Sequence, residues 1–225
     1  MCRLLVDDGY IVTGTTRKPE RVEALESLGV RPVVVDVFDS DLLRSEVVAA
    51  KPDVVVHQLT DLPPGLDPKL MPQARARNAR LREIGTRNLV SAATAAHAKQ
   101  FVAQSIAFAY APGAMPYDEA APLNVASADE AAALTARAVA SLEQQVLDGP
   151  FIATILRYGR LYGPGIGFDK PQGSGPVHVD AAADAAHRAI RLERPGVFNV
   201  AEEDGTVSSA SARAALDWNP AFRIG

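Results

Sequence analysis

Cysteine is almost missing from this sequence. The 225-residue chain has one cysteine, Cys2, so an internal disulfide framework and a multi-cysteine metal site are both excluded. His178 and Asp180 form too sparse a pair for a metal centre, which needs three or four ligands. We therefore predict no metal site. Because structural disulfides are rare in reducing compartments, the near-absence of cysteine is typical of a cytoplasmic protein.

Long apolar runs and excess positive charge are missing as well. No uninterrupted apolar stretch reaches the roughly 18 residues of a membrane-spanning helix, and the first nine residues are too short and polar for a secretory signal. The net charge of −4 and pI near 5.6 exclude a broadly basic nucleic-acid-binding surface. We expect a globular protein whose partners include neither nucleic acid nor membrane.

Apolar β-branched runs alternate with helical patterns along the chain. The runs contain Pro32-Val-Val-Val-Asp-Val37 and Asp53-Val-Val-Val-His-Gln58, which lack the polar alternation of a half-exposed strand. Such runs are typical of strands buried on both faces. Strands that alternate with helices predict a doubly wound parallel sheet with helices on both sides.

The expected elements have definite bounds. Strands are predicted at residues 10–16, 32–37, 53–58, 100–106 and 151–157. Helices are predicted at residues 19–28, 40–50, 73–98 and 127–148, the last capped by Ser127. Proline- and glycine-rich loops are predicted at residues 60–72, 111–126 and 159–176. Residues 1–8 have the pattern of the last turns of an amphipathic helix that Gly9 ends.

Several ordered motifs resemble the extended short-chain dehydrogenase family, the NAD-dependent epimerase/dehydratase group. They run through most of the chain: Asp53-Val-Val-Val-His-Gln-Leu-Thr60, Asn78 with Gly85-Thr-Arg-Asn-Leu-Val90, Gln100-Phe-Val-Ala-Gln-Ser105, Asp118-Glu-Ala-Ala-Pro-Leu123, Leu156-Arg-Tyr-Gly-Arg-Leu-Tyr-Gly-Pro-Gly165, Val177-His-Val-Asp180, Phe198-Asn-Val200 and Leu216-Asp-Trp-Asn-Pro220. The resemblance implies a Rossmann-like dinucleotide-binding domain over residues 1–162 and a small substrate lobe, interleaved with the sheet, over residues 163–225.

Two features of that family are absent. The family opens with a strand and a G-x-x-G-x-x-G turn that receives the dinucleotide pyrophosphate, and this sequence contains no such turn. We expect the central first strand to be missing, which leaves the strands at Tyr10 and Asp53 with unpaired edges. A start placed too far downstream and a natural short form would both explain this, and the first is favoured.

The second absent feature is the catalytic Y-x-x-x-K pair, whose lysine lowers the pKa of the tyrosine. The resemblance puts Thr135 at the tyrosine and Val139 at the lysine. The catalytic serine falls on Ser105 or, when Tyr110 is matched to the family's V-Y-G, on Ile106. The candidates for a replacement acid are Tyr110, Tyr117 and Tyr162, for each of which ordinary packing is the alternative.

The residues that follow the strands should line one crevice at the carboxyl edge of the sheet. The resemblance implies cofactor contacts from Thr15, Arg17, Asp36, Val37, Leu59, Thr60, Tyr158 and Leu161. Arg17 suits the 2′-phosphate of NADP, where an acidic residue would suit NAD. The alternative for Arg17 is a solvated strand end.

Two further sets of residues have a structural interpretation. His57 lies in an apolar strand and is predicted to be buried and hydrogen-bonded rather than a ligand. The long helix is basic, which is more typical of a solvated face than of steering for a phosphate-bearing ligand. Its arginines are Arg75, Arg77, Arg80, Arg82 and Arg87. The helices at residues 73–98 and 127–148 are candidates for a homodimer interface.

Two functions remain open from the sequence. The resemblance implies an NAD(P)-dependent epimerase/dehydratase-type oxidoreductase that acts on a sugar nucleotide or another small carbonyl or hydroxyl substrate. The missing Y-x-x-x-K pair favours the alternative, a non-catalytic relative that binds a nucleotide or acts as a regulatory module.

Overall fold

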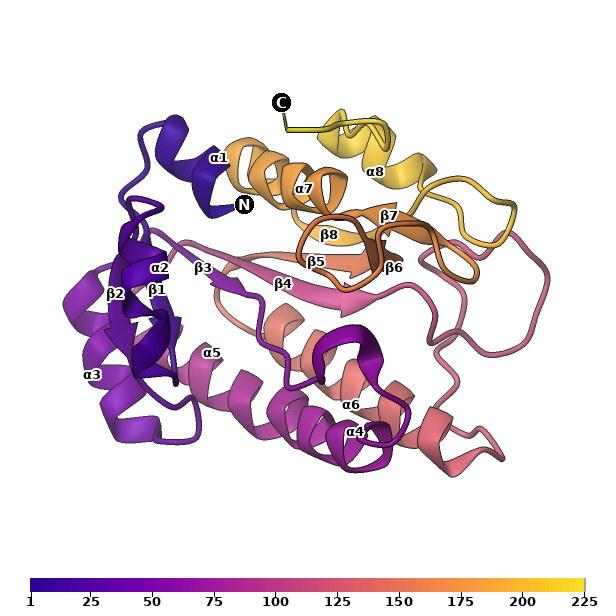
Figure 1. Ribbon diagram of the computed structural model, residues 1–225, viewed down its shortest axis with the longest axis horizontal. Coiled ribbons are helices and arrows are strands. Elements are labelled where there is room, and N and C mark those ends of the chain that lie inside the picture. The colour runs from indigo at the N-terminus through magenta and orange to yellow at the C-terminus, as the bar shows by residue number, and fades with distance from the viewer. Residues whose placement is uncertain (225) are drawn as a thin grey trace.

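The computed structural model describes residues 1–224 as a layered α/β structure. A parallel sheet lies between two layers of helices (Figure 1). Helices α1, α7 and α8 cover one side, and α3, α4, α5 and α6 cover the other. The predicted doubly wound, Rossmann-like parallel architecture is confirmed.

The elements follow one another in the alternation that the apolar runs predict. The strands are β1 (Thr13–Thr16), β2 (Arg31–Val34), β3 (Val54–His57), β4 (Gln100–Ile106), β5 (Ile152–Tyr158), β6 (Arg160–Tyr162), β7 (Pro176–His178) and β8 (Gly196–Val200). The α-helices are α1 (Cys2–Asp7), α2 (Val22–Glu26), α3 (Ser40–Ala50), α4 (Met71–Arg80), α5 (Thr86–Ala95), α6 (Glu130–Leu147), α7 (Val179–Leu192) and α8 (Ala210–Leu216). Shorter turns are η1 (Pro19–Arg21), η2 (Pro64–Leu66) and η3 (Leu81–Gly85).

The main sheet has the order β3-β4-β5-β8, with every pair parallel. Its centre is the long β4–β5 pair, which runs in register from Gln100↔Ile152 to Ile106↔Tyr158. These two strands are buried along nearly their whole length, as their continuous apolar character predicts. Strand β8 belongs to this sheet and α7 packs on β4 and β5, so residues after 163 contribute to the central layer. The boundary at residue 162 stays a prediction.

Strands β1 and β2 form a separate two-stranded parallel sheet. Within residues 1–224, β1 pairs only with β2, and β3 pairs only with β4. The edges of β1 and β3 are therefore unpaired, as expected for a sheet without a central strand between them. Apolar packing still links the two parts, because Val12, Val54 and Val56 pack against the same buried cluster, which includes Leu5.

Side-chain caps explain where the helices on both sides of the sheet begin. Asp39 accepts a hydrogen bond from the Leu42 amide at the start of α3, and Asp129 accepts from the Ala131 and Ala132 amides at the start of α6. The cap of α6 is thus Asp129, not the predicted Ser127. Aspartate binds the same free amides and also interacts favourably with the helix dipole.

The predicted long helix over residues 73–98 is present, but it contains a π-type turn. It begins at Met71, ends at Ala95 and is interrupted by η3, a π-type turn. A π-turn accommodates one extra residue inside an otherwise α-helical segment. The side-chain amide of Gln145 donates to the Glu83 carbonyl within this turn, at 3.2 Å.

The predicted loop over residues 159–176 contains two strands, β6 and β7, that pair in parallel. Each has only three residues, and β7 begins at Pro176, a position where a strand tolerates proline. The glycine and proline residues around these short strands are typical of a loop, so the sequence pattern does not indicate the strands. No helix within residues 1–224 is long and apolar enough to cross a membrane.

Candidate active site

The carboxyl ends of β1 and β3 are joined by a cluster of charged side chains. Asp61, four residues after β3, pairs with Arg17 after β1 at 2.6 Å and with Arg77 of α4 at 3.1 Å. Burial opposes ionisation of Asp61, but its hydrogen bonds and charge interactions with both arginines outweigh burial and lower its pKa. Arg17 is thus an ion-paired residue that bridges the two sheets, not a free solvated side chain.

The next strand ends supply exposed polar groups. Asp36 is exposed after β2, and its carboxylate accepts from the Phe38 amide at 2.9 Å. Thr15 and Thr60 are exposed as well. The Thr60 hydroxyl donates to Asn78 at 3.4 Å. These groups lie where a parallel α/β sheet binds ligands, outside the carboxyl ends of its strands.

The remaining predicted cofactor residues are less accessible. Val37 and Leu59 are partly buried and pack against the cluster beneath β2 and β3. Leu161 is also partly buried. Tyr158 has only 3% of its surface exposed, and burial raises the pKa of its hydroxyl, which a hydrogen bond with Gln58 offsets in part. The side chain of Tyr158 therefore belongs to the core of the molecule.

Ser105 lies in a buried polar network. Its hydroxyl donates to Glu143 of α6 at 2.6 Å, and Glu143 receives two more hydrogen bonds from Arg157, at 2.9 and 2.7 Å. Arg157 also donates to the Tyr110 hydroxyl at 3.1 Å, and Tyr110 donates to Asn199 at 2.5 Å. The Ser105 proton is committed to a carboxylate inside the protein. Its predicted catalytic role stays a prediction.

Thr135 and Val139 occupy the helix positions that the resemblance assigns to tyrosine and lysine. The Thr135 hydroxyl donates to the Ala131 carbonyl in its own helix, at 2.9 Å. Val139 is fully buried and packs with Ile106. Val139 has no ionisable group, and the predicted catalytic role of Thr135 stays a prediction.

The hydroxyl groups of the three candidate replacement tyrosines form hydrogen bonds with other groups of the protein. Tyr110 stacks on Tyr117 with ring centroids 5.2 Å apart. The Tyr117 hydroxyl accepts from the Gly113 amide, and the Tyr162 hydroxyl donates to Glu202 at 2.7 Å. The pKa of Tyr110 and the pKa of Tyr162 are both raised, chiefly by burial. A raised pKa makes a phenolate base less available at neutral pH.

Arg82 departs from the prediction of a solvated basic helix. It lies in η3, one turn from the buried residues Asn78 and Thr86, and so faces inward. Burial lowers the pKa of Arg82 to about 10, and the charge of Glu143 opposes this shift. Within residues 1–224 its guanidinium makes no hydrogen bond or ion pair. Arg82 is a charged group between the main sheet and α6 that pattern reading assigned to solvent.

His57 is buried, as predicted, and its Nε2 lies 3.0 Å from the Thr86 hydroxyl. Burial lowers the pKa of His57 to about 4, with a smaller contribution from the charge of Arg82. The ring is therefore neutral near pH 7.

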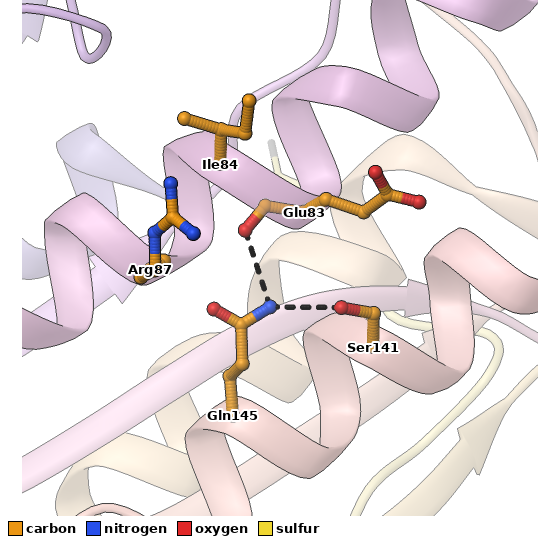
Figure 2. A pocket seen from close by; sticks show the side chains of 5 residues that line it. All are labelled: Glu83, Ile84, Arg87, Ser141 and Gln145. Carbon is orange, nitrogen blue, oxygen red and sulfur yellow. Dashed lines mark hydrogen bonds between the residues drawn. The ribbon is translucent and has the colours of Figure 1, made fainter.

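A pocket of about 450 Å³ lies away from the strand ends (Figure 2). It is lined by Glu83, Ile84, Arg87, Ser141 and Gln145, on the outer side of η3, α5 and α6. Figure 2 shows the Gln145 amide pointing to both the Glu83 carbonyl and the Ser141 hydroxyl. This pocket is on the face predicted to form a dimer and contains none of the predicted cofactor residues.

Comparison with known proteins identifies the family. The sequence profile of a family described as NAD(P)H-binding matches residues 1–189. The chain belongs to this family. A 3-diazoavenalumate denitrifying reductase from a Streptomyces species is 41% identical over 216 residues, which cover 87% of this chain and 69% of that protein. The family match and this relative place the chain among NAD(P)-binding oxidoreductase-family proteins.

Solved structures of low sequence identity share the fold. A UDP-glucose 4-epimerase from Thermotoga maritima superposes with a TM-score of 0.75 at 17% identity, over 97% of this chain and 88% of that chain. A UDP-glucuronic acid 4-epimerase from Bacillus cereus, in complex with NAD, gives a TM-score of 0.73 at 15% identity, over 99% and 87%. These likenesses support the Rossmann-like fold of the NAD(P)H-binding family.

The side chains at the carboxyl ends of β1, β2 and β3 have chemistry that fits one end of NAD or NADP. Arg17 and Arg77 provide guanidinium donors, and Asp36 and Thr15 provide exposed polar groups at the ends of β2 and β1. This donor set suits the ribose, phosphate and adenine groups of the cofactor. The chain contains no G-x-x-G-x-x-G turn to receive the pyrophosphate. The fit therefore concerns the adenosine end.

Sequence reading missed two members of this site. Asp61 and Arg77 were assigned to a loop and to a solvated helix face. Asp61 directly follows the strand motif that ends at Thr60, so its position at the end of a strand could have been predicted from the sequence. No sequence pattern indicates its pairing with Arg17, 44 residues earlier.

Proposed function

We propose that this protein is an NAD(P)H-dependent reductase whose acceptor gains a hydride without taking a proton from the protein. The observation that carries the proposal is the pair of residues at the tyrosine and lysine positions of α6. The Thr135 proton is bonded within the helix, and Val139 has no ionisable group. Reduction of a carbonyl to an alcohol needs a proton on oxygen, which a general acid supplies.

An acceptor that loses a neutral leaving group on reduction removes this need. The name of the Streptomyces relative describes a diazo compound that loses nitrogen on reduction. For a carbon-bound diazonium group the balance is simple: hydride forms the new C–H bond, the C–N bond breaks, and its electron pair leaves with N₂. When bound, the cofactor supplies the hydride. We propose a diazonium-type acceptor of this kind for the present chain.

The chain's own residues have binding and positioning roles in this proposal. Arg17 and Arg77 hold the adenosine end of the cofactor, with Asp61 fixing the two guanidinium groups in the free protein. The buried Glu143–Arg157 pair joins α6 to the carboxyl end of β5. Arg17 next to the crevice favours NADP over NAD.

Isotope transfer tests the proposal. The protein is incubated with 4-carboxybenzenediazonium and NADPH that carries deuterium at C4 of the nicotinamide. We expect deuterium in the benzoate product, N₂ release and a rate well above the protein-free control. Thr135→Val should retain the rate within about threefold, whereas loss of a true general acid costs about 10²–10⁴-fold. Benzoate without deuterium, or a loss of that size in Thr135→Val, would contradict the proposal.

The two other candidate functions give different results in the same experiment. A sugar-nucleotide epimerase or dehydratase, which the fold likeness alone supports, would convert UDP-glucose with NAD and leave the diazonium compound untouched. A non-catalytic nucleotide-binding module would bind NADPH and turn over neither compound.

A further inference from the structure

Arg160 and Phe108 form a pair at the carboxyl edge of the main sheet. Ile106 ends β4 opposite Tyr158, which ends β5. Phe108 and Arg160 each follow two residues after these strand ends. The two segments of the chain therefore leave the sheet side by side with these residues. Parallel α/β sheets bind ligands at this edge.

Two residues lie close to the Arg160 side chain. Its guanidinium carbon lies 4.4 Å from the centroid of the Phe108 ring. Gly173, at φ +64°, lies close to the same side chain, because an added Cβ there would be 3.0 Å from both Cδ and Nε of Arg160. The guanidinium is thus positioned before any ligand arrives, which reduces the entropy lost on binding.

The donors of this positioned guanidinium have no protein acceptor. Across residues 1–224, the Arg160 side chain makes neither a hydrogen bond nor an ion pair, and its surface is exposed. Arg157, three residues earlier, differs in this respect because Glu143 neutralises it. An arginine that is fixed in place but unpaired matches a planar anion, since its N–H groups bind a carboxylate in a bidentate manner.

Phe108 adds an apolar surface next to these donors. The residue is 42% exposed, although it is a large aromatic residue at the edge of a core. A flat conjugated ligand can pack on that ring while its carboxylate meets Arg160.

We infer that Arg160 is the specificity-determining residue that receives the carboxylate of a flat, conjugated substrate, with Phe108 as the platform for its body. This inference rests on the proposed reductase function and names the substrate class of the same site. The name of the Streptomyces relative, whose substrate is a carboxylate, agrees with this class.

Binding of trans-cinnamate to the full chain in the presence of NADPH tests the inference. Saturation-transfer NMR measures the affinity of the probe, of its methyl ester and of UDP. We expect cinnamate to bind, and we expect the affinity of its methyl ester to be about 10-fold lower or lower still. The affinity for UDP should not depend on Arg160. Charged hydrogen bonds are worth a loss of this size.

Variants separate charge from packing. Arg160→Met keeps an apolar stem and should weaken cinnamate about 10-fold or more, whereas Arg160→Lys should retain part of the binding. Arg44→Met removes an exposed arginine of α3 and is the matched control, with no expected change. Thermal unfolding midpoints show that each variant is folded.

The results that would contradict the carboxylate assignment differ from the result that would contradict the proposed reductase function. Equal affinity for cinnamate and its ester, an Arg160→Met variant that binds like wild type, or UDP binding that depends on Arg160 would overturn the carboxylate assignment. If the wild-type protein did not bind NADPH, this result would instead contradict the proposed reductase function. NADPH affinity should be the same in Arg160→Met and wild type.

Discussion

Replacing Glu143 by leucine should destabilise the protein by about 3–5 kcal/mol, the usual effect of breaking a buried ion pair. Glu143 and Arg157 are only 5% and 6% exposed, and two hydrogen bonds of 2.9 and 2.7 Å join them. Leucine keeps the volume but leaves the Arg157 charge buried without a counter-charge. Ser105 also loses its acceptor. A loss of this size is large against a typical total stability of about 5–15 kcal/mol.

Urea unfolding followed by circular dichroism measures this loss. The double variant Glu143→Leu/Arg157→Met removes both charges and should recover most of the stability, because a buried pair exchanged for apolar residues is often neutral. Lys99→Met breaks the exposed pair with Asp53 and should leave the midpoint unchanged. A Glu143→Leu loss below about 1 kcal/mol, or a double variant less stable than either single one, would refute the reasoning.

The remaining predictions concern titration, backbone fit, cofactor choice and assembly. His57 has a folded pKa of about 4 against 6.5 unfolded, so only the unfolded state gains its proton at first as the pH falls. Stability from this group is complete above pH 6.5 and falls by about 3 kcal/mol by pH 4; His57→Gln should have a flatter urea-midpoint profile, and identical profiles would contradict this. Gly159→Ala should lose about 1–3 kcal/mol or more in urea unfolding, because its Cβ would lie 2.0 Å from a backbone carbonyl oxygen; a wild-type midpoint would count against this contact. Arg17→Met should weaken NADPH more than NADH in calorimetric titrations, and an equal loss would show that Arg17 reads no phosphate. A homodimer through the helices at residues 73–98 and 127–148 should have twice the 23.8 kDa chain mass in light scattering, and the mass of a single chain would exclude it.

Burial explains which parts of the fold could be predicted from sequence. Strand β4 occupies residues 100–106 as predicted, because a continuous apolar run has few other stable environments. The π-turn η3 escaped prediction because residues on both sides keep helical periodicity. Strands β6 and β7 escaped because their three-residue length carries no periodic signal.

The candidate site was predicted less completely, since its members meet through the tertiary fold. Residues that follow strands could be named, and Arg17, Asp36 and Thr60 do lie at strand ends. The sequence does not indicate which side chains contact one another. Asp61 holds Arg17 across the gap between the two sheets, and Gly173 positions Arg160 from a distant loop. Ser105 lies one residue before the end of β4, close to the predicted position, but the direction of its hydroxyl depends on Glu143, 38 residues later.

Titration with NADPH, followed by isothermal calorimetry, tests the central claim that the carboxyl ends of these strands bind a nicotinamide dinucleotide. We predict saturable binding with one site per chain, weakened in Arg17→Met and unchanged in Arg44→Met. Absence of binding up to about 1 mM NADPH, equivalent to a binding free energy weaker than about −4 kcal/mol, would contradict it.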